Sequence, residues 1–384
     1  MAKLLFDGIA TQSSSRAKFH GGGEYAKFIL KTAIQQGNTN FDIVFNENLI
    51  TDLQLKAFID SQSNINVYYV RSKEELYELI DQNGYERFYS ALPIDYMDYH
   101  GKALFIMVIH GLRSIELPWD EFRYKYYAKT WQRILLKFLS CSKSFYKYLR
   151  EKHVKAIRKL VSVPNSRIIT VSEHSKYSLL SFFPFLDSAQ IHVFYSPFSF
   201  EKVELKDSFS TANYYLMISA NRYEKNVYRA MLAFDFLFSN NFLKEKKVVI
   251  LGATNYPFFS SMKNQSRFNL LPYVEYGELN KIFQNAYAFV YPSLNEGFGY
   301  PPLAAMNCGI PVLASSSTSI PEVCGDAAIY FNPLSIDDMA NRILQLNDKP
   351  DLYKDIVVKG QARVSELSCI LDTQIDEMLQ MIFK

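Results

Sequence analysis

Residues 291–333 read YPSLNEGFGYPPLAAMNCGIPVLASSSTSIPEVCGDAAIYFNP and hold two turns, each leading from an apolar run into a helical pattern. The first turn carries Glu296, and a helix is predicted from about Tyr300, with prolines in its first turn where a missing N–H costs nothing. The amides of Phe298, Gly299 and Tyr300 then lie at the positive end of the helix dipole. This arrangement is typical of a phosphate-binding site.

The second turn, 315–322, offers further hydroxyls and amides, among them those of Ser317 and Thr318. A single turn of this kind is more often structural than functional. Two such turns after successive strands, however, lie at the same edge of a parallel sheet, where α/β proteins bind their ligands. We therefore expect one ligand crevice formed by both turns.

Outward from this stretch, short apolar runs alternate with amphipathic helical patterns along the whole chain, which predicts parallel sheets covered by helices on both faces. The expected strands are 3–9, 41–46, 65–70, 87–92, 104–110, 168–172 and 191–195, then 214–219, 247–252, 269–274, 288–292, 311–315 and 328–331. This pattern indicates two Rossmann-like domains, 1–200 and 212–364, joined by a polar linker at 196–211. A helix predicted at 365–384 has one broad apolar face, and we expect it to pack back on the first domain.

Length and composition agree with two globular domains. The chain has 384 residues, 48% of them hydrophobic, and a net charge of +3, which excludes a nucleic-acid coat protein. Four cysteines without CxxC spacing predict neither a disulfide framework nor a structural metal site. The first 15 residues lack the apolar core of a signal peptide, and the longest apolar run, 103–109, is too short to span a bilayer. We expect a cytoplasmic protein, with no nucleic-acid partner.

One segment departs from this even charge distribution. Residues 122–160 contain twelve basic residues and one acidic residue, interleaved with aromatic and aliphatic side chains. Such a basic amphipathic helix or helix pair is typical of proteins that contact anionic lipid at the inner face of the membrane. The equally weighted alternative is a solvated helix whose apolar side packs on the first domain.

The motifs resemble those of a known family. EGFGYPPL at 296–303, GIPV at 309–312 and IPEVCGDAA at 320–328 closely resemble the donor-site block of the retaining GT-B glycosyltransferases of family four, the group 1 type. Similar motifs occur at 21–25 (GGGEY), 108–113 (VIHGLR), 169–176 (ITVSEHSK) and 219–226 (SANRYEKN), so the resemblance covers most of the chain. It implies a GT-B fold, with two Rossmann-like domains facing each other across a cleft.

The resemblance also implies roles for individual residues. Lys225 and, by a less usual spacing, Arg222 would bind the donor diphosphate and stabilise the charge that grows on it as the sugar leaves. Glu296 would orient the donor sugar through its hydroxyls. His110 would support the reacting face of that sugar. Further donor-binding positions are Gly22, Gly23, Phe298, Gly299, Tyr300, Ser317 and Thr318; Ser172 and Lys176 would line the cleft, and Glu322 is expected to cap a helix rather than touch ligand.

One position departs from the family pattern. The family has a second glutamate eight positions after the first, where it holds the ribose of the nucleotide, but this chain has Ala304 there. Three explanations are open: a donor with deoxyribose, such as a dTDP-sugar; another residue that takes over the contact; or a weakened or inactive enzyme.

The resemblance implies a hexosyltransferase that moves a hexose or deoxyhexose from a nucleotide-diphospho-sugar, with retention, to a glycan or lipid-linked acceptor in bacterial surface polysaccharide synthesis. A rhamnosyl- or mannosyltransferase fits this description. The chain has no DxD motif, which agrees with a metal-independent mechanism without a cofactor. The alternatives are a non-catalytic GT-B subunit that binds a partner transferase or glycan, favoured by Ala304, and a GT-B sugar-nucleotide epimerase, whose motifs are not found.

Overall fold

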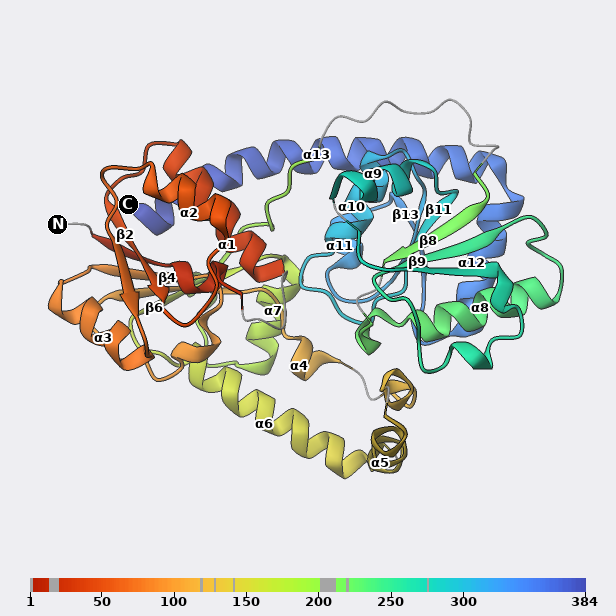
Figure 1. Ribbon diagram of the computed structural model, residues 1–384, viewed down its shortest axis with the longest axis horizontal. Helices are drawn as coiled ribbons and strands as arrows, with labels where there is room; N and C mark the ends of the chain where they lie inside the picture. Colours follow the sequence, from red (N-terminus) through yellow and green to blue (C-terminus); the bar gives the residue numbers. More distant parts are fainter. Residues whose placement is uncertain are drawn as a thin grey trace. The chain divides into compact units, whose positions relative to one another are not determined.

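The computed structural model describes residues 3–13, 21–117, 120–127, 129–140, 142–200, 212–218, 221–274 and 276–384. The chain forms two compact units (Figure 1). Unit 1 comprises Met1–Leu112, Lys152–Pro197 and Ile370–Lys384, and unit 2 comprises Arg113–Glu151 and Phe198–Cys369. Each unit is built around one parallel sheet.

The sheet of unit 1 has the strand order β3-β2-β1-β4-β5-β6-β7, and every neighbouring pair is parallel. Its central strands β1, β2, β4 and β5 are almost entirely buried, as expected where helices cover both faces of a parallel sheet. The strands are β1 (Leu4–Asp7), β2 (Phe41–Asn46), β3 (Val67–Val70), β4 (Arg87–Ser90), β5 (Leu104–Ile109), β6 (Ser166–Thr170) and β7 (Ile191–Val193).

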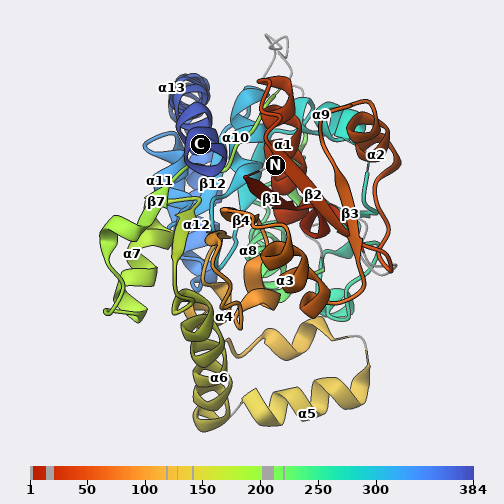
Figure 2. The ribbon, with the colours of Figure 1, turned by 90° about the vertical axis from the view of Figure 1, so that its left-hand side faces the viewer.

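The helices of unit 1 begin where the sequence supplies a cap. Asp52, Ser72 and Ser172 each accept a hydrogen bond from a backbone N–H in the first turn of the helix that follows. Figure 2 shows α1, α2 and α3 lying against the strands of this unit. The helices are α1 (Gly21–Gln35), α2 (Leu53–Asp60), α3 (Lys73–Gln82), α7 (Glu173–Phe182) and the second half of α6 (Lys143–Val161).

Unit 2 holds a six-stranded parallel sheet with the order β10-β9-β8-β11-β12-β13. Its strands are β8 (Tyr214–Ile218), β9 (Lys247–Leu251), β10 (Phe268–Leu271), β11 (Ala288–Tyr291), β12 (Val312–Ser315) and β13 (Ala328–Phe331). Its helices are α4 (Arg113–Glu116), α5 (Thr130–Ser140), α8 (Val227–Ser239), α9 (Tyr276–Gln284), α10 (Tyr300–Asn307), α11 (Ile320–Cys324), α12 (Ile336–Asp348) and most of α13 (Pro350–Phe383).

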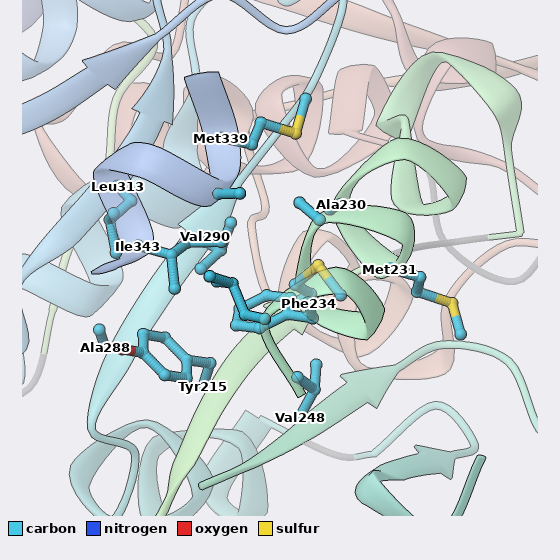
Figure 3. Close-up of a cluster of buried hydrophobic side chains, with 14 of the residues drawn as sticks. Tyr215, Ala230, Met231, Phe234, Val248, Ala288, Val290, Leu313, Met339 and Ile343 are labelled. Carbon is cyan, nitrogen blue, oxygen red and sulfur yellow. The ribbon is translucent and has the colours of Figure 1, made fainter. Parts of the chain in front are cut away.

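The core of unit 2 lies between this sheet and helices α8 and α12. Figure 3 shows Phe234 of α8 and Ile343 of α12 meeting Tyr215, Val290 and Leu313 from three neighbouring strands. All five side chains are fully buried. This core fixes the ends of β8 and β11, from which the predicted donor-binding loops start.

Helix α13 belongs to both units. Its first half contributes Tyr353, Ile356 and Val357 to the core of unit 2. Its end lies in unit 1, where Tyr25 Oη donates to Met378 Sδ at 3.2 Å and the Phe383 ring lies 5.0 Å from that of Phe41.

The sequence predicted this helix over 365–384. In the structure the helix begins at Pro350 and continues through Gly360. A Cβ atom at Gly360 would lie 3.1 Å from Met306 Cγ, so the glycine allows close packing of α13 on α10.

All thirteen predicted strands are present, with ends shifted by a few residues, and both sheets are parallel as predicted. The basic segment 122–160 forms two helices, α5 and α6. The structure differs from the expected division in one respect, because 113–151 groups with unit 2 and not with the first domain. Of the predicted linker, 196–200 has no regular structure and 201–211 lies outside the described residues.

Candidate active site

The first predicted turn places Glu296 at the centre of a buried polar cluster in unit 2. Lys225 Nζ donates to Glu296 Oε1 at 2.6 Å, and Ser293 Oγ donates to the same oxygen at 2.5 Å. Lys225 Nζ also lies 3.3 Å from the hydroxyl of Tyr291 at the end of β11. Two residues 71 positions apart in the sequence therefore form one ion pair.

The loops that carry this pair are held together by their backbones. The carbonyl oxygen of Glu224 accepts from Leu294 N at 2.8 Å and lies 3.2 Å from Ser293 Oγ. Asn226, with φ at 57°, donates through Nδ2 to the carbonyls of Pro292 and Pro333. Lys225 therefore has a fixed position next to Glu296.

The environment keeps Glu296 ionised. Burial by itself raises the pKa of a carboxyl group. The charge and hydrogen bond of Lys225, together with the hydroxyls of Ser293 and Tyr291, outweigh burial and hold the pKa of Glu296 below its ordinary value. An ionised carboxylate next to an ammonium group is suited to orient sugar hydroxyls beside a negatively charged leaving group.

The second predicted turn supports the first one. Thr318 Oγ1 accepts from Glu296 N at 3.0 Å, and Ser319 Oγ lies within 3.0 Å of the carbonyls of Glu296 and Phe298. Ser317 is half-buried beside them, and its N–H donates to Ser315 Oγ. The structure thus brings the two turns together, as the shared sheet edge predicted. A positioning residue missed by the sequence analysis is Ser319.

Helix α10 starts directly after this cluster. Gly299 is its N-cap, with φ at 109°, and Pro301 lies in its first turn. Glycine is suited to this left-handed backbone conformation and has no side chain to cap the helix. The positive end of α10 therefore lies three residues beyond Glu296, with Tyr300 exposed at its first position.

Arg113 is a further site residue that the sequence did not predict. Its guanidinium donates to Glu224 Oε1 at 3.2 Å, and its second nitrogen lies 3.8 Å from Glu296 Oε2. Arg222, predicted as the second cation, pairs with the same Glu224 oxygen at 3.6 Å and remains half exposed. Arg113 appears in the VIHGLR motif, but only the tertiary structure brings it to Glu296.

A short segment anchors Arg113 to unit 2. Asp120 and Arg229 form a buried two-bonded ion pair with both N–O distances at 3.0 Å, and Arg229 also lies over the ring of Phe122. Asn295 donates to Glu116 at 2.7 Å. These contacts explain why 113–151 groups with unit 2.

The predicted residues of unit 1 lie at the end of β5 and the start of α1. His110 Nε2 is 3.0 Å from the carbonyl of Ala91, and the Tyr25 ring contacts the imidazole edge-on at 4.8 Å. Gly22 and Gly23, predicted as a loop, lie instead in the first turn of α1. A Cβ atom at Gly22 would lie 2.5 Å from Leu92 Cδ2 and 3.5 Å from His110 Nε2, so the glycine permits close approach.

Two further predictions concern unit 1 and the second turn. Ser172 is the buried N-cap of α7, with its hydroxyl bonded to Ser175, whereas we expected it to line the cleft. Glu322 lies in the first turn of α11, and its carbonyl accepts from Arg363.

Within the described ranges, no three His, Cys, Asp or Glu side chains are grouped so that they could hold a metal ion. None of the helices in the described part of the chain has the length and apolar character needed to cross a membrane.

The family comparison decides what kind of domain carries the Lys225–Glu296 pair. Residues 200–363 match the family model "Glycosyl transferases group 1". The chain carries a glycosyl transferases group 1 domain. This group 1 domain includes both loops of the candidate site and helix α10, and the match confirms the predicted group 1 type for residues 200–363.

Curated relatives of this chain are named as mannosyltransferases. O-antigen chain mannosyltransferase RfbU of Salmonella typhimurium is 29% identical over 197 residues, which cover 48% of this chain and 52% of that protein. O-antigen chain mannosyltransferase B of Escherichia coli is 43% identical over 100 residues, 26% of either chain. The chain thus spans about half or less of the length of these relatives.

Solved structures match nearly the whole chain. HepE of Anabaena in complex with UDP has a TM-score of 0.68 at 13% identity, with 99% of this chain and 100% of that chain covered. Sucrose-phosphate synthase of Thermosynechococcus elongatus has a TM-score of 0.69 at 12% identity, with 99% and 98% covered. The predicted GT-B fold is therefore confirmed, with the group 1 domain as its second half.

Proposed function

We propose that this protein is a retaining glycosyltransferase that moves a mannosyl group from a nucleotide-diphospho-sugar to a growing glycan of a bacterial surface polysaccharide. The observation that carries the proposal is the buried Lys225–Glu296 pair in front of helix α10, inside a group 1 domain. The names of the curated relatives support mannose and O-antigen synthesis.

In the proposed reaction the donor diphosphate binds at the start of α10, where Phe298, Gly299 and Tyr300 present the positive end of the helix. Lys225 and Arg222 add two cations. As the bond from the sugar to the phosphate breaks, negative charge grows on the phosphate, and fixed cations stabilise that state more than the ground state. This chemistry needs no metal ion, and we propose that the enzyme uses none.

Glu296 accepts hydrogen bonds from hydroxyls of the donor sugar. Its carboxylate is suited to this role, because Ser293 and Lys225 fix one oxygen and the Thr318 hydroxyl holds the Glu296 backbone N–H. We propose that His110 is a second residue that acts on the sugar, and that the departing phosphate takes the acceptor proton on the face where the new bond forms. That geometry gives retention of configuration.

We further propose that the acceptor is lipid-linked and that the segment 122–160 holds the enzyme at an anionic membrane surface. The excess of basic residues in this segment supports this contact. The alternative of a non-catalytic subunit is not favoured, because the curated relatives are all named as transferases.

The test is a thermal-shift screen of the purified protein with UDP, GDP, ADP, CMP and dTDP and their sugars, followed by a transfer assay with the stabilising donor. A ligand that binds only the folded state raises the melting temperature by mass action. We expect one nucleotide with its mannosyl derivative to stabilise the protein. Stabilisation by none of them would contradict the proposal and favour the non-catalytic subunit.

Ala304 lies in α10, one turn after Tyr300, on the helix that starts the proposed donor site. If the alanine reflects a donor with deoxyribose, Ala304→Glu should shift the preference from dTDP- toward UDP- or GDP-sugars, because a carboxylate accepts bonds from both ribose hydroxyls. Competition assays with matched donors measure the ranking. An unchanged ranking would eliminate the deoxyribose explanation.

A further inference from the structure

Helix α5 exposes four large apolar side chains to solvent. Trp131 is 61% exposed, Ile134 67%, Leu135 48% and Phe138 80%. These four residues follow the spacing i, i+3, i+4 and i+7, so they form one stripe along the helix. We call this stripe the α5 apolar stripe.

The opposite flank of α5 holds the helix on unit 2. Gln132, Leu136 and Leu139 are half-buried, and α5 packs on the 3-10 turn η3 (Arg123–Tyr126). Arg133 donates to the carbonyl of Pro257 at 3.3 Å. The stripe is therefore exposed on a helix that is anchored by its other side, and not on a detached one.

Basic side chains surround the stripe. Lys129 is exposed directly before α5, Lys137 is exposed on α5, and Lys143 and Lys147 are exposed on the first turns of α6. An apolar stripe flanked by exposed lysines matches an anionic lipid surface, because the acyl region buries the stripe while the headgroups pair with the ammonium groups. Trp131 is of the residue type enriched at the membrane–water interface.

We propose that α5 lies in the surface of an anionic membrane, with Trp131, Ile134, Leu135 and Phe138 inserted at the boundary of headgroups and acyl chains. This inference deepens the membrane contact of the proposed function by assigning the insertion to α5. A second copy of the chain fits the stripe less well, since two such faces would bring together the same lysines.

The test uses co-sedimentation of the full chain with vesicles of phosphatidylethanolamine and phosphatidylglycerol in a 7:3 ratio, and with phosphatidylcholine vesicles as the neutral comparison. We expect binding to the anionic vesicles and at least tenfold weaker binding to the neutral ones. Ile134→Ser with Phe138→Ser should lower the affinity for anionic vesicles at least tenfold. Phe236→Ser, at a phenylalanine of α8 that is also about half exposed, is the matched control and should bind as the wild type does.

The charge contribution is tested separately with Lys129→Glu and Lys137→Glu, which leave the Arg133 contact to Pro257 intact. Binding should fall at least tenfold and should also fall in the wild type at high salt. Melting temperatures within a degree of the wild type would show that these exposed substitutions do not unfold the chain.

Trp131 reports on the insertion itself. Tryptophan emission should shift to the blue when anionic vesicles are added, and Trp131→Phe should keep the binding but lose most of this shift. Equal binding by Ile134→Ser/Phe138→Ser and the wild type would overturn the proposal. A wild-type dimer in sedimentation velocity that this double variant abolishes would also overturn it, in favour of self-association.

These measurements need no donor, so they are independent of the transferase reaction. Absence of vesicle binding together with transferase activity on a soluble acceptor would contradict the proposal for α5 alone. Failure of every nucleotide to bind, with vesicle binding intact, would contradict the proposed transferase function alone.

Discussion

At the scale of single residues, the candidate site depends on one buried carboxylate with two cations around it. Glu296 Oε1 forms an ion pair with Lys225, and the Arg113 guanidinium lies near Glu296 Oε2. Removal of the Glu296 carboxylate would leave the largely buried Lys225 ammonium group without its ion-pair partner.

We expect Glu296→Gln to lower kcat about a hundredfold, because an amide cannot orient the sugar hydroxyls as a carboxylate does, and a misplaced sugar reacts slowly. The measurement is the initial rate of transfer with the donor identified by the nucleotide screen. Glu322→Gln, a neutralised carboxylate in the neighbouring turn, is the matched control and should keep its activity. Equal transfer rates for both variants would show that Glu296 does not act in the transfer reaction.

A second residue-scale prediction concerns Asp7 at the end of β1. Burial raises the pKa of this carboxyl to about 6, although Ser90, Tyr96 and backbone amides donate to it. The native state therefore binds its proton more tightly than the unfolded chain, so the contribution of Asp7 to stability is fully present at low pH and is lost as pH rises from about 4 to 6.

Asp7→Asn should remove this dependence. Relative to the wild type, the variant should gain about 1 to 2 kcal/mol of unfolding free energy between pH 5 and pH 8. Urea titrations at both pH values measure the difference. A difference that does not change with pH would show that Asp7 titrates as it does in the unfolded chain.

At the scale of elements, the segment that carries Arg113 is held by the buried Asp120–Arg229 pair. Asp120→Ala should destabilise unit 2 by about 3 to 5 kcal/mol, because Arg229 would remain buried without its carboxylate. Calorimetry should show a fall in melting temperature of about 6 °C or more for a unit of this size. Glu121→Ala, at the exposed neighbouring residue, is the control. An equally small fall in melting temperature for both variants would contradict the expected role of the Asp120–Arg229 pair.

At the scale of the whole molecule, α13 contributes to two cores. Met378 is fully buried in unit 1, and Ile356 is buried in the core of unit 2. We expect Met378→Ala and Ile356→Ala each to cost about 2 to 5 kcal/mol, but in different units, since each leaves a cavity in a separate core.

Scanning calorimetry distinguishes the two effects. If the units unfold as separate cooperative blocks, each variant should lower a different transition. A common shift of one transition by both variants would show instead that α13 couples the two units into a single block.

The sequence by itself determined the fold class, the thirteen strands and the two loops that form the candidate site. These features depend on local patterns: apolar runs of strand length, a glycine and two prolines at the start of α10, and a charged residue in each turn. Such local patterns can be recognised in a single sequence, because each element is specified by its own residues and their periodicity.

Only the tertiary structure decided which charges meet and which faces stay exposed. Arg113 and Ser319 join the site through long-range contacts, and 113–151 belongs to unit 2 through a buried ion pair. Helix α13 continues through Gly360, where the glycine packs closely against Met306. The exposed stripe of α5 could not be distinguished from a core-facing one by its periodicity. Pairing and burial depend on residues far apart in the sequence, and no local pattern records them.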